Sequence, residues 1–207
     1  MLQTQAVYAD TLALLNKLMA LPVLAPFELV GGTALALQIG HRISVDLDLF
    51  SSSDFNEDEV LEALLDLGET KPLNKQRNSL NVLVNEVKVD ILKYRYPIIG
   101  EVAKEQGIRM LTAKDIAPMK LDAMAARGAK KDFIDIYFLL EKFSLKDMLT
   151  LHKEKYQSES QFHITRSLTY FADADRQAMP IMLREIDWEK VKESLEGKVR
   201  DFMMERK

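Results

Sequence analysis

The sequence predicts an α+β fold in which strands come first and helices follow. Between residues 79 and 91 apolar and polar side chains alternate, which is typical of paired strands. From Thr112 onward nearly every segment has apolar residues at helical spacing, and a chain of 207 residues that is 47% hydrophobic can bury a core. We therefore expect an α/β core in residues 1–110 and a helical region in residues 111–207.

Spacing and turn residues predict alternating helices and strands in the first region. The predicted helices cover residues 7–21, 34–37 and 57–67, and the predicted strands cover residues 27–30, 45–49, 79–84 and 87–91. Thr33 can cap the second helix, and Asp54 or Asn56 the third. The last two strands form a hairpin that turns near Asn85 and Glu86.

The second region reads as a series of helices. They cover residues 113–127, 130–142, 145–156, 160–171 and a segment from Trp188 toward the C-terminus. Gly128 separates the first two helices. We expect Phe162, Phe171 and Trp188 to lie in the core of this region.

A glycine pair followed by a carboxylate pair carries the strongest functional signal. Gly31 and Gly32 allow the backbone to approach a ligand closely, and the amides at the start of the following helix can bind phosphate. Asp46 and Asp48 lie two residues apart on a predicted strand, so they share one face. A nucleoside triphosphate (NTP) with Mg²⁺ or Mn²⁺ requires such a combination. The alternative is the solvated face of an edge strand.

Residues 45, 47 and 49 of the same strand are apolar, and we expect them to anchor it in the core. In the hairpin, Asp90 lies opposite an apolar face, as Asp46 and Asp48 do on their strand. A third carboxylate can therefore join the first two. It would complete a second metal site or act as a base toward an acceptor hydroxyl.

Arg42 and Ser44 precede the carboxylate pair and share its face by the same alternation. Ser44 can hydrogen-bond a phosphate or a metal-bound water. Arg42 can bind a phosphate bidentately, or it can form a surface ion pair with a residue such as Asp48. The residues alone leave both roles of Arg42 open.

A second group of charged residues lies in the helical region. Lys120 and Arg127 share one side of a predicted helix, and Asp132 and Asp135 follow one turn apart on the next. Lys120 could reach a nucleotide phosphate. The two carboxylates could orient Lys120, position an acceptor, or only cap and solubilise their helix.

These motifs resemble the nucleotidyltransferase fold, in which Gly-Ser is followed at a distance by Asp-x-Asp. More narrowly, G-G-T-x-L with R-x-S-x-D-L-D-L-F, followed by Lys120, Arg127 and the Asp132–Asp135 pair, resembles the AbiEii/AbiGii toxin family over about residues 27–140. The resemblance implies a nucleotidyltransferase-like mixed β-sheet with flanking helices and a helical part that completes the active site. Thr33 stands where the wider fold usually has serine.

The resemblance implies a metal-dependent enzyme that uses an NTP. By that analogy Lys120 contacts the triphosphate, and Asp135 rather than Asp132 completes the active site. The expected catalytic residues are Asp46, Asp48, Asp90, Lys120 and Asp135. The expected nucleotide-binding residues are Gly31, Gly32, Thr33, Arg42, Ser44, Lys120, Arg127 and Asp132. The expected metal ligands are Asp46, Asp48 and Asp90.

The same resemblance bears on partners. Members include toxins of type IV toxin–antitoxin and abortive-infection systems, and some relatives add nucleotides to the acceptor end of tRNA. We therefore expect an RNA or tRNA acceptor and an antitoxin protein that is encoded separately. The residues leave two alternatives open, a nucleotide-binding regulatory protein without turnover and an enzyme that modifies a small molecule such as an antibiotic.

Composition excludes several other classes. A net charge of −4 argues against coating nucleic acid through global charge, and the absence of cysteine excludes disulfides and thiolate chemistry. The sequence has no signal-peptide pattern and no apolar run of the roughly 20 residues that span a bilayer, so we expect a cytoplasmic protein without a membrane partner. A local basic groove remains open, with candidate residues Lys71, Lys75, Arg77, Lys114, Lys120, Arg127, Lys130 and Lys131.

Overall fold

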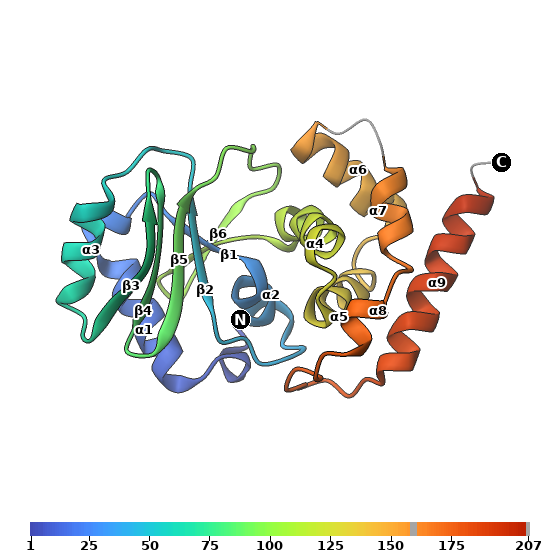
Figure 1. Cartoon of the computed structure of the whole chain (residues 1–207), viewed down its shortest axis with the longest axis horizontal. Helices are drawn as coiled ribbons and strands as arrows, with labels where there is room; N and C mark the ends of the chain where they lie inside the picture. Colours follow the sequence, from blue (N-terminus) through green and yellow to red (C-terminus); the bar gives the residue numbers. More distant parts are fainter. Residues whose placement is uncertain (158–160, 206–207) are drawn as a thin grey trace. The chain divides into compact units, whose positions relative to one another are not determined.

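A computed structural model describes residues 1–157 and 161–205. The contacts divide the chain into two compact units, Met1–Thr112 and Ala113–Lys207. The first unit holds the sheet and the second is helical (Figure 1). An α+β fold is therefore confirmed.

The first unit is built on a seven-stranded mixed sheet with the order β3-β4-β5-β2-β1-β7-β6. The strands are β1 (Glu28–Val30), β2 (Leu47–Ser51), β3 (Thr70–Gln76), β4 (Ser79–Val84), β5 (Val87–Lys93), β6 (Val102–Glu105) and β7 (Ile108–Leu111). Strand β2 runs parallel to β5 and antiparallel to β1. The central strands are thus contributed by segments far apart in the sequence.

Helices cover both faces of this sheet. The helical segments of the unit are η1 (Thr4–Ala6), α1 (Ala9–Ala20), η2 (Pro22–Leu24), α2 (Gly31–Ile39) and α3 (Glu57–Leu65). Figure 1 shows α1 and α3 on one side of the strands and α2 on the other. Leu47, Leu49, Val89 and Ile91 are fully buried on one face of β2 and β5, whereas Asp48 and Asp90 lie on the opposite face.

The predicted hairpin and the cap of the third predicted helix are confirmed. Asn85 and Glu86 have φ angles of 47° and 64°, the left-handed geometry that a tight two-residue hairpin turn requires. Asn56 caps α3, since its side chain accepts hydrogen bonds from the amides of Asp58 and Glu59.

Three strands were not predicted. Strand β3 is a polar edge strand with almost no buried residue. Strands β6 and β7 have four residues each and pair as a hairpin. Short or exposed strands lack the alternation from which a strand is recognised.

The prediction that Thr33 caps a helix is wrong. Helix α2 begins at Gly31, directly after β1, and Val30 occupies the cap position without a side-chain hydrogen bond. Thr33 lies inside the first turn and is fully buried. Its hydroxyl bonds to residues near the carboxylates, as described below.

Val45 does not anchor its strand in the core. It precedes β2 and is 49% exposed, whereas Leu47 and Leu49 are fully buried. Regular alternation starts only at Leu47, so the period-two argument does not extend back to Val45.

The second unit contains the helices α4 (Ala113–Arg127), α5 (Lys130–Leu139), α6 (Leu145–Tyr156), α7 (Phe162–Ser167), α8 (Ala172–Asp175) and α9 (Trp188–Met204). Gly128, with φ of 56°, separates α4 from α5 as predicted. Helix α4 packs against α5, α6 and α7, and α9 packs against α5 and α6.

An aromatic cluster fixes part of this helical core. Phe133 lies 5.2 Å from Phe171 and 6.0 Å from Trp188, measured between ring centroids. Phe162 does not join the core and is 66% exposed, contrary to the prediction. The predicted start of its helix at Ser160 lies outside the described residues. No helix in the described part of the chain is long and apolar enough to cross a membrane.

Candidate active site

Gly31 sits against the side chain of Asp48 at the junction of β1 and α2. Its φ angle is 68°, a left-handed conformation that side chains rarely adopt, and a Cβ atom there would clash with Oδ2 of Asp48. Val30 is the register partner of Asp48, which brings the start of α2 beside this carboxylate. Glycine is therefore required at position 31 for two reasons, the left-handed backbone conformation and the close approach of the Asp48 side chain.

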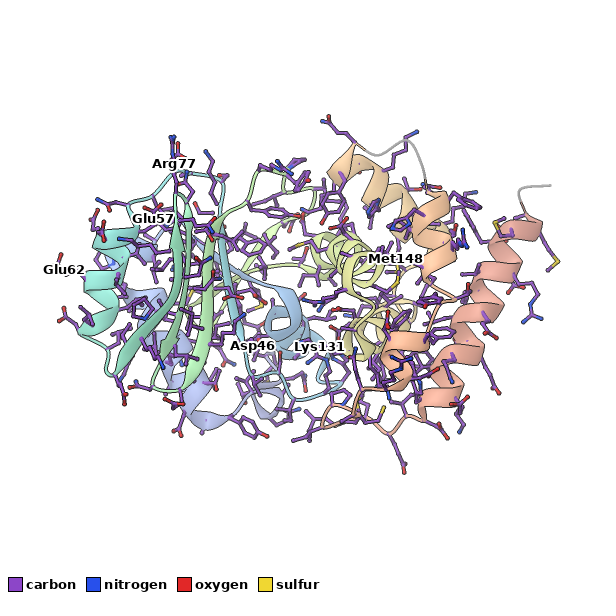
Figure 2. The ribbon with its side chains drawn as sticks, in the orientation of Figure 1. Asp46, Glu57, Glu62, Arg77, Lys131 and Met148 are labelled. Atoms are coloured by element: carbon purple, nitrogen blue, oxygen red, sulfur yellow. The ribbon has the colours of Figure 1, made fainter. Side chains whose placement is uncertain are left out.

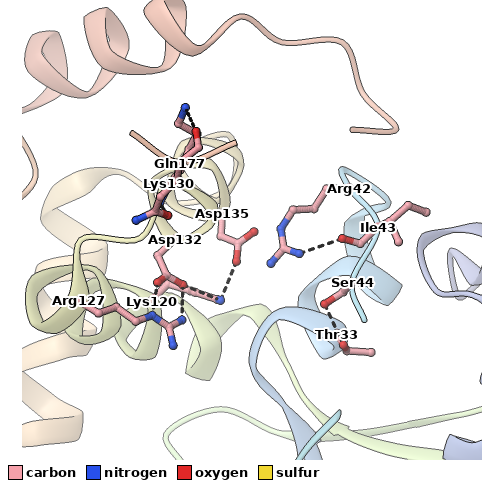
Figure 3. Close-up of polar contacts among 10 residues, drawn as sticks. All are labelled: Thr33, Arg42, Ile43, Ser44, Lys120, Arg127, Lys130, Asp132, Asp135 and Gln177. Atoms are coloured by element: carbon pink, nitrogen blue, oxygen red, sulfur yellow. Dashed lines mark hydrogen bonds and ion pairs between the residues drawn. The ribbon is translucent and has the colours of Figure 1, made fainter. Parts of the chain in front are cut away.

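Gly32 lies against Arg42 and Ser44 in the same way. A Cβ atom at Gly32 would stand 2.7 Å from a guanidinium nitrogen of Arg42 and 3.2 Å from Oγ of Ser44. Arg42 also donates from Nη1 to the carbonyl oxygen of Ile43 at 3.1 Å (Figure 3). Gly32, Arg42 and Ser44 thus lie together within the first unit.

Thr33 links the helix start to the segment that carries the carboxylates. Its hydroxyl is 2.9 Å from Oγ of Ser44 (Figure 3) and donates to the carbonyl oxygen of Asp46. The amide of Ser44 donates to the carbonyl oxygen of Ala6 at 2.9 Å. Buried hydrogen bonds of this kind hold the backbone before β2 in a single position.

Asp48 and Asp90 face each other across neighbouring strands. They are register partners in the parallel pair β2–β5, so their side chains stand on one face of the sheet. Asp46, which is labelled in Figure 2, lies two residues before Asp48. All three carboxylates are partly exposed. Asp90 does not point into the core.

Asp90 is held by two neighbours on the same face. Its Oδ1 accepts from the side-chain amide of Asn81 at 2.8 Å, and its Oδ2 accepts from Nζ of Lys88 at 2.6 Å. The pKa of Lys88 is raised because its ammonium bonds to Asp90 and is attracted by the charges of Asp90, Asp46 and Asp48, while partial burial opposes the shift. Lys88 thus lies within electrostatic range of all three carboxylates, which form one negatively charged patch.

Sequence reasoning did not identify Asn81 or Lys88. On a strand, an asparagine and a lysine at polar positions look like ordinary surface residues. Side-chain alternation could have identified Lys88, because it precedes Asp90 by two residues on a strand and must therefore share its face.

Oxygen donors suit a divalent magnesium or manganese ion. Asp46, Asp48 and Asp90 supply only carboxylate oxygens, and the side chain of Asp48 lies directly against Gly31 at the start of α2. Among the described residues, no group of three or more acidic or histidine side chains is arranged as a ready metal-binding cluster. The chemistry of the three carboxylates fits such an ion, with Lys88 bonded to one of their oxygens.

The second unit contains a buried ion-pair cluster. Nζ of Lys120 lies 3.1 Å from Asp132 and 2.7 Å from Asp135, and both carboxylates are fully buried (Figure 3). Arg127 adds two hydrogen bonds to Asp132, at 2.6 and 2.9 Å. Of the roles considered for the two aspartates, orienting Lys120 agrees with this geometry. Capping and solubilising an exposed helix does not, because neither carboxylate reaches solvent.

Lys130 is not a residue of an open basic groove. Only 6% of it is exposed, its Nζ donates to the carbonyl oxygen of Gln177 at 2.5 Å (Figure 3), and it lies 5.0 Å from the Trp188 ring centroid. Lys131, in contrast, is exposed.

The basic residues of β3 and its turn do not gather at the carboxylates either. Figure 2 shows Arg77 at the turn between β3 and β4, at the opposite end of the sheet from Asp46. Lys75 pairs with Asp58 of α3 at 2.5 Å.

The sheet, with a glycine-led helix and carboxylates on β2 and β5, has the architecture of a nucleotidyltransferase. Two solved structures share the fold. The nucleotidyltransferase toxin MenT4 of Mycobacterium tuberculosis aligns over 94% of this chain and 86% of its own, with 14% identity and a TM-score of 0.55. ANT(2")-Ia, solved with adenylyl-2"-tobramycin, aligns over 70% of this chain and 95% of its own, with 14% identity and a TM-score of 0.54.

The family described as "Nucleotidyl transferase AbiEii toxin, Type IV TA system" matches residues 13–205. The chain therefore belongs to the AbiEii family of nucleotidyltransferases. An uncharacterized Aquifex aeolicus protein, aq_aa25, is 34% identical over 195 residues, which cover 91% of this chain and 94% of the relative. The family match extends well beyond Leu140, where the resemblance seen in the sequence ends.

Proposed function

We propose that this enzyme transfers a nucleoside monophosphate from an NTP to an acceptor hydroxyl of RNA, with tRNA favoured, and that it needs Mg²⁺ or Mn²⁺. The observation that carries the proposal is the pairing of Asp48 with Asp90, beside Asp46 and the start of α2. A nucleotide-binding protein without turnover would not need the Asp48–Asp90 pair with Asp46 close by in the chain. Family membership also favours the enzyme.

The three carboxylates hold the metal in this proposal. A bound divalent ion would neutralise the charge that develops on the entering and leaving oxygens. The acceptor oxygen attacks the α-phosphorus, pyrophosphate leaves, and the hydroxyl proton must be removed. Asp90, on the strand next to Asp48, is assigned to the second metal position or to this proton.

The start of α2 is assigned to the triphosphate. The first amides of a helix attract anions, and the absence of side chains at Gly31 and Gly32 lets Asp48, Arg42 and Ser44 lie against this helix start. Ser44 and Arg42 lie beside Gly32 and are assigned to phosphate oxygens. Thr33 acts mainly by holding Asp46 and Ser44, since its hydroxyl bonds to both.

The charged cluster of the second unit is assigned to the same substrate by family resemblance. Lys120 is the proposed triphosphate contact, with Asp132 and Asp135 fixing its ammonium. Arg127 bonds to Asp132 and is half exposed, so it too can meet a phosphate. Asp135 is the residue of this cluster assigned to the active site itself.

The family's description as a type IV toxin–antitoxin system supports the proposed biological role, and the resemblance to these toxins supports an RNA acceptor. We propose a cytoplasmic toxin that a separately encoded antitoxin silences. A second candidate, transfer to a small molecule, is favoured by the likeness to ANT(2")-Ia, whose structure contains an adenylylated antibiotic.

Label transfer tests the proposal. The full chain is incubated with each α-³²P-labelled NTP and Mg²⁺, in parallel with total RNA, a protein extract and an aminoglycoside, beside the Asp46→Ala variant. Label that enters RNA and disappears with the variant supports the proposal. Label only in the aminoglycoside supports the second candidate, and no Asp46-dependent transfer to any acceptor would refute both.

A further inference from the structure

We propose that Lys88 is a built-in counterion of the metal site, which a divalent metal must displace from Asp90 before the site can form. The inference rests on the proposed function, because it concerns the three carboxylates assigned to the metal. It assigns a positioning role to a residue outside the motifs found in the sequence.

Both oxygens of Asp90 already have a donor. Asn81 donates to Oδ1 at 2.8 Å and Lys88 donates to Oδ2 at 2.6 Å. A metal ion that binds Asp90 through Oδ2 would lie beside this ammonium and compete with it for the same oxygen. Metal binding at Asp90 is then an exchange rather than a simple addition.

The two donors differ in how easily they can leave. Asn81 has a short side chain and is the register partner of Asp90 across β4 and β5, so the strand pairing itself keeps it in place. Lys88 has a long side chain that is 44% exposed, while that of Asp90 is 17% exposed. Lys88 can swing into solvent at little cost, and Asn81 can continue to orient the carboxylate.

Lys88 interacts with the whole patch rather than with one partner. Its ammonium bonds to Asp90 at 2.6 Å, on the face that also carries Asp48, the register partner of Asp90. An ammonium and a divalent ion within a few ångströms of each other repel strongly. The same position therefore cannot serve both cations at once.

The exchange has a functional consequence. Without metal, Lys88 offsets the repulsion among three carboxylates and keeps Asp90 in its binding orientation. With metal, displacing Lys88 subtracts from the binding free energy, so Lys88 raises the metal concentration at which the site fills. The enzyme would hold an ordered site that remains empty at low metal concentration.

Direct metal binding tests this inference without relying on activity. Mn²⁺ alone is titrated into the full chain, and free Mn²⁺ is followed by electron paramagnetic resonance. The variants are Lys88→Met, the conservative Lys88→Arg and the control Lys93→Met. Lys93 lies on the same strand and carries the same charge, but it pairs with Asp54 at 2.9 Å. The two Met variants therefore change the net charge equally, and thermal unfolding verifies that each is folded.

We expect Lys88→Met to bind Mn²⁺ about threefold more tightly than wild type or tighter still. A partly exposed ion pair such as Lys88–Asp90 is a weak interaction, so breaking it should lower the affinity of wild type for the metal by a factor of this order. Lys93→Met and Lys88→Arg should remain near wild type. Equal affinities for Lys88→Met and Lys93→Met, or weaker binding by Lys88→Met, would overturn the inference.

Asp46→Ala separates this inference from the proposed function. If wild type binds Mn²⁺ and Asp46→Ala does not, the proposed metal site stands whatever the result for Lys88. If folded wild type binds no Mn²⁺, or Asp46→Ala binds it equally well, both the site and the role of Lys88 are refuted.

Discussion

Asp48 and Asp90 are direct partners across β2 and β5, with side chains on the same face of the sheet. Parallel pairing brings together two carboxylates from distant segments of the chain, and the start of α2 lies against one of them. This relationship places the helix start that we propose to bind phosphate beside the carboxylates of β2 and β5 within the first unit.

Asp46→Asn and Asp48→Asn should each lower transfer activity by at least about a hundredfold, because metal-assisted charge stabilisation contributes several kcal/mol to such a step. Both residues are partly exposed on a negatively charged face, so removing one charge should not lower the free energy of unfolding. Activity is measured by label transfer and stability by thermal unfolding. A large loss of stability would mean that the carboxylates hold the fold rather than the metal.

Gly31→Ala should destabilise the protein by more than the roughly 1–2 kcal/mol that a left-handed conformation costs an ordinary residue. The excess arises because the new Cβ atom displaces Asp48. Gly107→Ala is the matched control, since Gly107 has φ of 82° but no atom within 4 Å of an added Cβ. Gly31→Ala should also abolish transfer, whereas Gly107→Ala should retain it. Equal behaviour of the two variants would show that the contact with Asp48 is unimportant.

How far the sequence predicts this site depends on whether its signals are local. The glycine pair, the face on which Asp48 lies and the hairpin that carries Asp90 follow from period-two alternation and turn residues. The parallel pairing of β2 with β5 does not, because register between distant segments is decided by packing of the whole sheet. Alternation in the hairpin predicts only that Asp90 lies on a polar face and can join the other carboxylates.

Other features were outside the reach of sequence patterns for identifiable reasons. Lys88 and Asn81 occupy polar strand positions that solvated residues occupy equally well. Lys130 lies in a run of charges, yet the carbonyl oxygen of Gln177 and the ring of Trp188 bury it, and both come from much later in the chain. Only tertiary contacts distinguish such residues from an exposed basic patch.

Lys120→Met should both destabilise the second unit and weaken NTP binding. Removing the ammonium leaves Asp132 and Asp135 buried without their common partner, which costs about 3–5 kcal/mol. Loss of a charged hydrogen bond to phosphate should raise the NTP dissociation constant by about tenfold or more. Denaturant unfolding and nucleotide titration measure the two effects.

Lys155→Met provides the control for Lys120→Met. Lys155 forms a fully buried ion pair with Asp115 at 2.7 Å, so its loss should destabilise the second unit to a similar extent. It has no assigned role in binding, and the NTP affinity of the folded variant should remain at the wild-type value. If both variants lost affinity equally, Lys120 would have only a structural role.

His152 should make the protein sensitive to mild acid. Burial lowers the pKa of His152, and the nearby carboxylate of Asp122, 3.7 Å away, only partly opposes the shift. The unfolded chain therefore takes up a proton near pH 6.5 while the folded chain still resists it. The stability from the neutral imidazole is present above that pH and is lost as the pH falls toward the lower folded pKa, by up to about 1.4 kcal/mol per pH unit.

His152→Phe should remove this dependence while retaining ring packing against Tyr156. Denaturant unfolding between pH 7.5 and 5.5 measures the slope, with the exposed residue His163 changed to Gln as control. An unchanged slope in His152→Phe would assign the acid sensitivity to another group.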